Sequence, residues 1–366
     1  MAKTPAPLTY GKYLKLSRLL GSQERKSEAA GQPAHDEMLF IIVHQAYELW
    51  FKQILFELDQ VQAQFAHPKL DDAGLDRAVH LLGRVVEIEK LLIRQLDILE
   101  TMTPLDFLEF RDLLVPASGF QSLQFRLIEN RLGLRRQDRL LPGQQPYDAR
   151  LPAADRAAIA AAEATPSLSD QVEAWLKRMP FIELRSYRFG EVYRDAVERM
   201  LENEAELVRA NKAIKAEERD AELGQLAAAR ARFESIFDPK RHQALREAGE
   251  WRLSWQALQA ALFINLYRHE PILQMPFRLL NALMDLDEQL ATWRYRHVLM
   301  VQRMIGRKVG TGGSSGHDYL GRAAEQHRIF GDLFALSTYF IPRSQLPGLP
   351  PEVRAAMSRG PARARS

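Results

Sequence analysis

Apolar residues recur at intervals of three and four along most of this chain, and that spacing constrains the fold more than any other feature. Such spacing places the apolar side chains on one face of a helix. Alternating strand patterns joined by hairpin turns are missing. The sequence therefore predicts an all-α fold, a bundle of long helices. The expected helices cover residues 36–65, 75–99, 119–132, 189–237 and 277–306, the last beginning just after Pro276.

We expect one helical domain over residues 1–366, with two regions that depart from the pattern. Between Gly133 and Pro180 the apolar spacing loosens, which predicts an inserted, exposed helical segment at about 135–180. The last residues, 350–366, carry an excess of basic side chains and are expected to be a disordered tail. Neither region contains a candidate site residue.

The composition excludes several classes of site. The chain has no cysteine, so disulfides, thiolate zinc sites, iron–sulfur clusters and cysteine nucleophiles are all ruled out. Any metal must be held by His, Asp, Glu or a porphyrin. The 50 basic and 47 acidic residues are interspersed, so nucleic acid is not implied as a partner. No apolar run approaches the roughly eighteen residues of a membrane span, and the first residues lack the apolar core of a secretory signal. A cytoplasmic protein is therefore expected.

Two histidines lie on apolar faces of the expected helices. His297 shares a face with Trp293 and Met300, and His44 is flanked at helical spacing by Phe40 and Phe51. Each could be a core histidine bonded to a backbone carbonyl, or His297 could be an axial ligand to a metal or haem iron. The pair could bracket a planar cofactor, although an aromatic stripe of this kind is also typical of a simple core.

The other histidines carry weaker signals. His35, Asp36 and Glu37 stand together, but consecutive helical residues diverge by about 100°, so we interpret them as a helix start and not as a metal site. Three further histidines lie in polar or proline-flanked sequence: His67, His242 and His327. His80 lies on an expected helix that is mostly solvated, and all four are expected at the surface.

Arg111 is a candidate for binding a carboxylate. It follows Phe107 by four residues, which places a guanidinium beside an aromatic ring. Its planar fork suits a bidentate carboxylate, but a structural salt bridge would serve it equally well. Both interpretations remain open from the local sequence. The possible salt-bridge partners are Asp106, Glu109 and Asp112. A few residues later, Ser118 and Gly119 open a further helix with free backbone donors.

A glycine-rich loop, GTGGSSG, follows the last long helix at residues 310–316. It lacks the Gly-Lys-Ser/Thr ending of a phosphate loop and follows a helix instead of a strand, so it fails as a nucleotide site. The hydroxyls of Thr311, Ser314 and Ser315 would suit a flexible lid.

Several long motifs occur in an order that resembles the tryptophan 2,3-dioxygenase family, haem enzymes that open the indole ring of L-tryptophan with O2. The resemblance covers nearly the whole chain. The matching segments are LTYGKYL, HDEMLFIIVHQAYELWFKQILFELD, FRDLLVPASGFQSLQFR, WRYRHVLMVQRMIGRKVGTGGSSGHDYL and LSTYFIPR. It implies a haem b cofactor in a helical pocket, N-formyl-L-kynurenine as the product, and a place at the first step of tryptophan catabolism by the kynurenine pathway.

The resemblance also assigns roles around the haem. His297 matches the proximal iron ligand, and His44 with Phe40 matches the distal pocket. Ser118 and Gly119 match residues beside the haem and its bound ligand. We expect His44 to hydrogen-bond the indole N–H instead of acting as an indispensable base, because that N–H is very weakly acidic.

The remaining matches concern the substrate and the assembly. Arg111 matches the carboxylate-binding arginine, Phe107 the residue against the indole, and Thr311 the hydroxyl that contacts the ammonium group. Tyr10 and Tyr13 match tyrosines that reach into a neighbouring subunit's active site, which implies a homotetramer.

The sequence leaves two other classes of function beside the one that this resemblance implies. A haem-based sensor of oxygen or tryptophan would use His297 but would need no arginine and no ammonium site. A haem-free helical scaffold would use none of these residues, and it would purify without colour.

Overall fold

The computed structural model describes residues 7–67, 70–140, 146–184, 187–306, 321 and 326–359. In this part of the chain the structure is helical apart from one antiparallel pair of two-residue strands, β1 (Glu183–Leu184) and β2 (Tyr187–Arg188). The predicted all-α fold is confirmed. No helix among the described residues is both long enough and apolar enough to cross a membrane.

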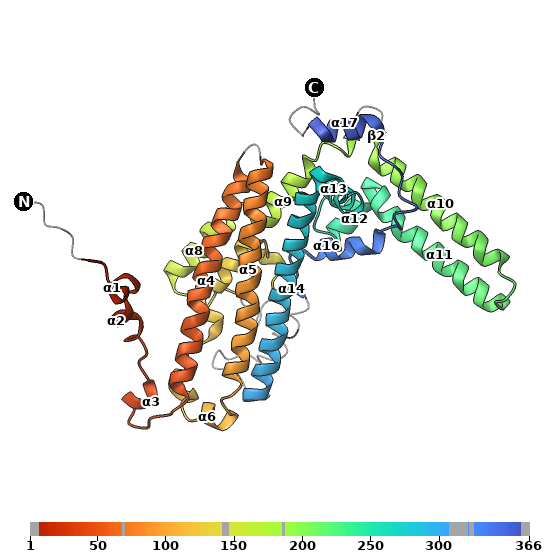
Figure 1. Ribbon diagram of the computed structural model, residues 1–366. Coiled ribbons are helices and arrows are strands. Elements are labelled where there is room, and N and C mark those ends of the chain that lie inside the picture. The colour runs from red at the N-terminus through yellow and green to blue at the C-terminus, as the bar shows by residue number, and fades with distance from the viewer. Residues whose placement is uncertain are drawn as a thin grey trace, which may run out of the picture.

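Three long helices lie side by side and form the frame of the molecule (Figure 1). They are α4 (Glu37–Ala66), α5 (Asp72–Leu99) and α14 (Pro271–Ile305), and α5 packs against both of the others. The start of α5 is fixed by Asp71, whose side chain accepts a hydrogen bond from the Gly74 amide at 2.9 Å. The expected helices at 36–65 and 75–99 are confirmed to within three residues.

Helix α14 begins earlier than the sequence predicts. Pro276 was expected to precede the helix, but it lies inside it, in the second turn after Pro271. Proline at the first position costs no hydrogen bond, whereas Pro276 removes one from the ladder. The burial of Leu273, Leu279 and Leu280 on either side compensates for that loss, since each of these side chains is fully buried.

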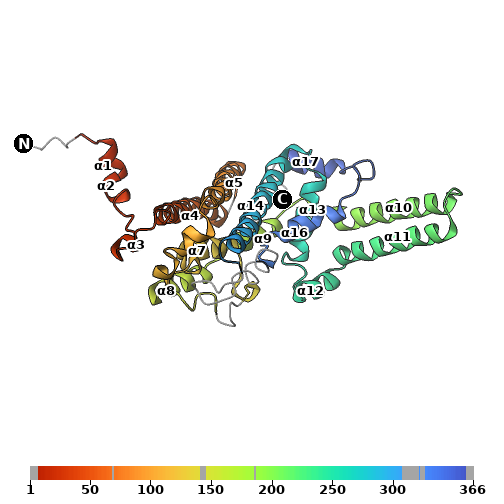
Figure 2. The same cartoon turned by 90° about the horizontal axis from the view of Figure 1, so that it is seen from below.

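The expected single helix at 189–237 is two helices that fold back on each other. They are α10 (Phe189–Ala210) and α11 (Ala216–Phe237), and they project from the body as a hairpin (Figures 1 and 2). The sequence prediction was wrong because turn chemistry interrupts good helix formers here. The Asn211 side chain accepts a hydrogen bond from the Ala213 amide at 3.0 Å, which closes a turn before the next helix starts.

The expected helix at 119–132 is also divided. A short 3₁₀ turn, η2 (Gly119–Gln121), precedes α7 (Leu123–Leu132), and Ser122 lies between them. The Ser122 hydroxyl accepts a hydrogen bond from the Phe125 amide at 3.2 Å and so caps α7. Residues 118–122, called the 118–122 loop below, are therefore the short turn η2 with one residue on either side, instead of the first turn of α7.

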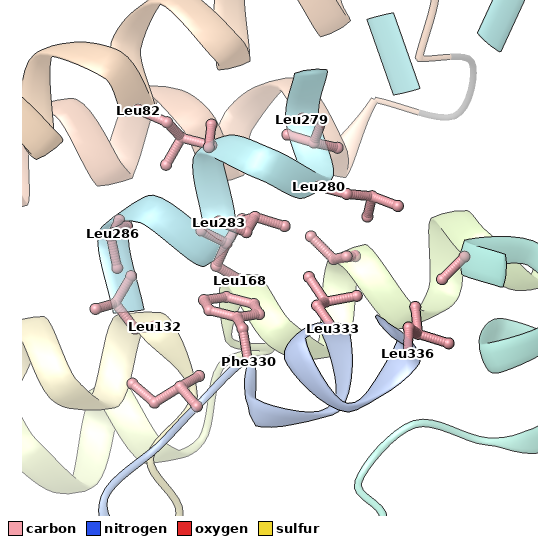
Figure 3. Packing of buried hydrophobic residues seen from close by; sticks show 14 of the residues in the cluster. Leu82, Leu132, Leu168, Leu279, Leu280, Leu283, Leu286, Phe330, Leu333 and Leu336 are labelled. Atoms are coloured by element: carbon pink, nitrogen blue, oxygen red, sulfur yellow. The ribbon is translucent and has the colours of Figure 1, made fainter. Parts of the chain in front are cut away.

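The main core joins the long helices to the second half of the chain. Helix α13 (Trp255–Leu266) is buried on nearly every face, and α9 (Leu168–Lys177) packs against it. Figure 3 shows Leu283 of α14 close to Leu168 of α9 and to Phe330. These contacts place α14 between the core and the site described below.

Two regions differ from the expectation of exposed or disordered chain. Helix α8 (Ala153–Glu163) packs against α7 and buries only Ile159, in a small separate cluster. Helix α9 carries buried leucines at both ends, so this last part of the 135–180 segment belongs to the main core. That this segment is an insertion stays a prediction. The expected disordered tail is wrong for its first part, because α17 (Pro351–Arg359) buries Val353 and Met357. Residues 360–366 lie outside the described chain.

The N-terminal residues form an arm that extends away from the body (Figure 1). The buried carboxylate of Glu37, at the start of α4, accepts hydrogen bonds from the Lys26 and Ser27 amides at 2.7 and 2.9 Å. His35, Asp36 and Glu37 are therefore a helix start, as predicted. The shorter helices are α1 (Tyr10–Leu14), α2 (Leu16–Leu19), α3 (Lys26–Ala29), α6 (Pro104–Leu108), η1 (Arg111–Leu114), η3 (Arg136–Asp138), α12 (Pro239–Glu247), α16 (Gly331–Ala335) and η5 (Leu336–Tyr339).

Candidate active site

A cavity of about 310 Å³ lies between α4, α5 and α14 and is bordered by the segment from α6 to α7. It brings together side chains separated by more than 250 positions in the sequence. The candidate residues that line it are Phe40, His44, Phe51, Phe107, Arg111, Ser118, Gly119 and His297. Eight of the residues that line this cavity were thus named as candidates from the sequence, and the roles assigned to them stay predictions.

His297 lies in the α14 wall of the cavity. Its ring stacks on that of Trp293, one helical turn earlier, with centroids 5.1 Å apart and planes within 6°. Burial lowers the pKa of His297 to about 4, with a smaller contribution from the nearby His44, so the ring is neutral at neutral pH. In the described chain, no backbone carbonyl or side chain hydrogen-bonds this imidazole. A neutral, unpaired imidazole that faces a cavity is an available metal ligand.

His44 lies in the α4 wall with a defined tautomer. Its Nδ1 is 2.7 Å from the carbonyl oxygen of Phe40, and because a carbonyl only accepts, Nδ1 carries the proton. Nε2 is then an unprotonated acceptor. Burial lowers the pKa of His44, while the Phe40 carbonyl and the charge of Glu48 act in the opposite direction. His44 therefore offers a neutral acceptor to the cavity.

Aromatic rings form the wall beside His44. The Phe40 ring lies 4.1 Å from the His44 ring and stacks on Phe107 at 5.7 Å between centroids. Further along α4, Phe51 contacts Phe125 at 5.6 Å. Flat rings at these separations suit an extended aromatic ligand, because offset or tilted ring contacts are favourable.

Arg111 is positioned on η1 with only 15% of its side chain exposed. Its ion pair with Asp112 spans 3.8 Å to a carboxylate that is 90% exposed, which is longer than a hydrogen bond. Asp106 instead caps α6 through Thr103. The choice between a structural salt bridge and a carboxylate site at Arg111 therefore stays open.

A buried group of charges at the cavity wall was not found from the sequence. Glu129 is 1% exposed, and its oxygens accept from Arg126 at 3.2 Å, from Arg294 at 2.8 Å, and from Arg139. Burial alone would raise the pKa of Glu129, but the three arginines outweigh it and hold the pKa far below its usual value. Charged residues at i and i+3 on the inner face of α7 were the available signal.

Two histidines expected at the surface are buried, which corrects that prediction. His327 is 2% exposed, lines the cavity and accepts a hydrogen bond from the Leu140 amide at Nε2, 3.3 Å away. His242 is 1% exposed and bonds the Leu253 carbonyl at 2.9 Å. Their polar sequence neighbours misled the prediction, because the residues that cover them are distant in the chain. His67 and His80 are exposed, as predicted.

Some candidate residues are not described, and others lie away from this cavity. Thr311 lies outside the described residues, as do Ser314 and Ser315. Tyr10 and Tyr13 lie on α1, far from the cavity of their own chain, with 75% and 69% of their surfaces exposed. Their predicted role requires a second subunit.

The donor set limits what metal the cavity can hold. Within the described residues no group of three or more His, Asp or Glu side chains is arranged to bind an ion. A haem iron takes four ligands from its porphyrin and needs one from the protein, which His297 can supply. The residues present therefore fit a haem better than a bare metal ion.

Comparison with known proteins identifies the family of this chain. The family model described as tryptophan 2,3-dioxygenase matches residues 2–340. A tryptophan 2,3-dioxygenase of Bdellovibrio bacteriovorus is 50% identical over 352 residues, covering 96% of this chain and 98% of that protein. Proteins of the same name from Alteromonas mediterranea and Dictyostelium discoideum are 47% and 46% identical, covering 97% and 95% of this chain and 98% and 87% of their own lengths. The chain therefore belongs to the tryptophan 2,3-dioxygenase family of oxidoreductases.

Proposed function

We propose that this protein is a haem-dependent enzyme that adds both atoms of O2 across the C2–C3 bond of the indole of L-tryptophan, giving N-formyl-L-kynurenine. The observation that carries the proposal is one cavity that combines the unpaired His297, the acceptor His44 and Arg111. Family membership supports the reaction class, and the cavity supports the assignment of the residues.

His297 would hold the cofactor through its iron. When bound, haem supplies the iron centre at which O2 is bound and activated. The neutral state of His297 favours this role, because a protonated imidazole cannot donate a lone pair to a metal. Arg126 and Arg294 add positive charge to the same cavity, where carboxylate groups on a ligand would be stabilised.

Arg111 would bind the substrate carboxylate, and the phenylalanines would enclose the indole. A hydrogen bond to a charged group is worth about 1.5–3 kcal/mol, and an unpaired carboxylate in this apolar surrounding would cost more. Phe40 and Phe107 stack at the edge of the same cavity. Thr311 is the proposed partner of the ammonium group, and Ser118 and Gly119 the proposed neighbours of the haem and its ligand.

His44 would orient the indole by accepting a hydrogen bond from its N–H at Nε2. The bond from Nδ1 to the Phe40 carbonyl fixes the tautomer that this role requires. We therefore assign His44 to binding and orientation, with no transfer of the indole proton to it.

A haem-based sensor without turnover is the alternative. It would use His297 equally well, but it gives no reason for Arg111 to line the cavity. Membership of a family of dioxygenases makes the sensor the weaker proposal.

The deciding experiment is an anaerobic absorption spectrum of the reduced, haem-loaded protein with and without L-tryptophan, followed by admission of air. We expect a histidine-ligated ferrous spectrum that changes with L-tryptophan and then the near-ultraviolet band of N-formyl-kynurenine. Haem with no product would support the sensor, and failure to bind haem would overturn the role of His297.

A homotetramer is part of the proposal, with the N-terminal arm entering a neighbouring active site. Ile42, Leu49 and Phe56 repeat every seven residues on α4 and are 49%, 52% and 61% exposed, which favours a helix-packing interface. Removing residues 1–14 should leave haem binding intact and lower activity, because Tyr10 and Tyr13 would be lost from the neighbouring site. Full activity in the truncated protein would refute the arm's role. A cytoplasmic location remains a prediction from the sequence.

A further inference from the structure

The carboxylate of Glu48 connects two walls of the cavity. The proposed function assigns no role to this carboxylate. Glu48 lies one helical turn after His44 on α4 and lines the same cavity. Its Oε1 accepts a hydrogen bond from the Ser122 hydroxyl at 2.6 Å, and its Oε2 accepts one from the Gln124 side-chain amide at 2.7 Å. The main-chain carbonyl of Glu48 accepts from the same Gln124 amide at 2.7 Å.

Of the two residues that Glu48 holds, Ser122 ends the 118–122 loop and Gln124 lies in the first turn of α7. Within this loop, Ser118 and Gln121 bond each other, and the Ser122 amide donates to the Gly119 carbonyl at 3.1 Å. The loop is therefore closed on itself by short turns. Ser118, Gly119 and Ser122 all line the cavity, so a movement of the loop would change the shape of the site.

The position of Glu48 ties this loop to His44. A helix rises about 1.5 Å per residue, so the two side chains leave α4 about 6 Å apart along a rigid segment of thirty residues. The three bonds to Ser122 and Gln124 transmit that rigid spacing to the loop. His44 and the 118–122 loop both line the cavity, and these bonds hold them in a fixed relation to each other.

We propose that Glu48 is a positioning residue that sets the separation between His44 and the 118–122 loop, and thereby the orientation of the indole between them. It acts through Ser122 and Gln124 and takes no part in bond making. This inference rests on the proposed function, because it concerns the substrate of that same cavity. A misplacement of the substrate by about 1 Å can cost on the order of 100-fold in rate. Loss of this positioning should therefore lower turnover more than affinity.

The test uses the haem-loaded protein and compares Glu48→Ala and Glu48→Gln with Ser122→Ala, with Gln124→Met, with the double variant of these two, and with the triple variant that adds Glu48→Ala. We expect kcat to fall by roughly 10- to 100-fold in Glu48→Ala with a much smaller change in KM. The Ser122→Ala/Gln124→Met double variant should reproduce most of that loss. Adding Glu48→Ala to the double variant should lower kcat little further, since the same bonds are already absent.

Glu57 provides a matched control on the same helix. It is a buried carboxylate that accepts from Gln53 at 2.6 Å and from Arg84 at 2.7 Å, and it does not line the cavity. Glu57→Gln should lower the denaturation midpoint while leaving kcat and KM unchanged. If Glu48→Ala behaves like Glu57→Gln, Glu48 is only structural and the proposal is overturned.

A second measurement separates this proposal from the proposed function. Amide hydrogen exchange at residues 119–125 should become faster in Glu48→Ala and should not change in Glu57→Gln, whether or not the protein turns over L-tryptophan. If the wild-type protein forms no product but exchange is still faster in Glu48→Ala than in the wild type, the proposed function is rejected and the positioning role of Glu48 is kept. If the wild-type enzyme is active and Glu48→Ala changes neither the exchange nor kcat, only the positioning role of Glu48 is rejected.

Discussion

Two carboxylates in this molecule each gather arginines, one at the cavity wall and one on the projecting hairpin. Glu129 of α7 is 1% exposed and bonds Arg126 and Arg294 as well as Arg139. Glu202 of α10 is 48% exposed and pairs with Arg209 at 2.9 Å and Arg230 at 3.4 Å. The ion-pair geometry is similar, but water reaches only the second group.

That difference in hydration distinguishes the cavity wall from the projecting hairpin. Buried charges have lost their water and depend on one another, so removing one partner leaves the rest uncompensated. Exposed pairs on the hairpin are screened, and each partner can turn to water. The cavity wall therefore carries buried charges, whose removal destabilises the fold, beside residues that face the cavity. The hairpin is stabilised by helix propensity and by a small apolar contact between its two helices.

The largest effect is expected at the proposed haem ligand. His297→Ala should abolish stable haem binding, because in the described residues no second unpaired imidazole occupies its place on α14. The haem content of the purified protein, read from its absorption spectrum, measures this. His44→Ala is the control and should retain haem while binding or turning over L-tryptophan poorly. The opposite behaviour of the two variants would mean that the proximal and distal walls are exchanged.

Next in size is the loss of the buried carboxylate. Glu129→Gln keeps the volume but leaves three buried arginines without a counter-charge, so the free energy of unfolding should fall by about 3–5 kcal/mol. Denaturant unfolding at neutral pH measures it. A loss no larger than that of a surface substitution would mean that the buried arginines are hydrated, and the comparison between the two regions would fail.

Acid should weaken the cavity wall through His327. Burial lowers the pKa of His327 to about 4, so between its unfolded value near 6.5 and pH 4 the unfolded chain binds the extra proton. The stability contributed by neutral His327 is thus present above this range and is lost as the pH falls through it. His327→Gln cannot take up that proton, and between about pH 7.5 and about pH 5 it should lose roughly 1–2 kcal/mol less stability than the wild type. Equal losses in the two proteins would show that His327 does not titrate in this range.

Substrate affinity should depend on the geometry of the charged group at Arg111. Arg111→Lys replaces a planar fork with a point charge, so KM for L-tryptophan should rise about tenfold with a smaller change in kcat. Steady-state kinetics measures both constants. Arg209→Lys, at an exposed ion pair on the hairpin, is the matched control and should change neither. An unchanged KM in Arg111→Lys would refute the carboxylate role.

The sequence predicted the helices of the frame better than the region around the cavity's charges. Periodicity identified α4 and α5 because a single buried face determines each of them. The turn at Asn211 was missed because its neighbours are good helix formers and the interruption depends on a local side-chain bond. His327 was misplaced for a different reason. Its partner Leu140 is 187 positions away, and only the tertiary fold brings them together.

The smallest effect is expected at Glu202 on the hairpin, where a carboxylate also pairs with arginines but is exposed to water. Glu202→Gln should leave the denaturation midpoint and the activity unchanged within error, because Arg209 and Arg230 remain solvated when the carboxylate is lost. Unfolding in low and high salt, beside Glu129→Gln, measures the contrast, and any small difference should disappear in high salt. A loss approaching that of Glu129→Gln would mean that Glu202 is shielded from water in the assembled protein. The hairpin would then be part of an interface, and hydration would no longer distinguish it from the cavity wall.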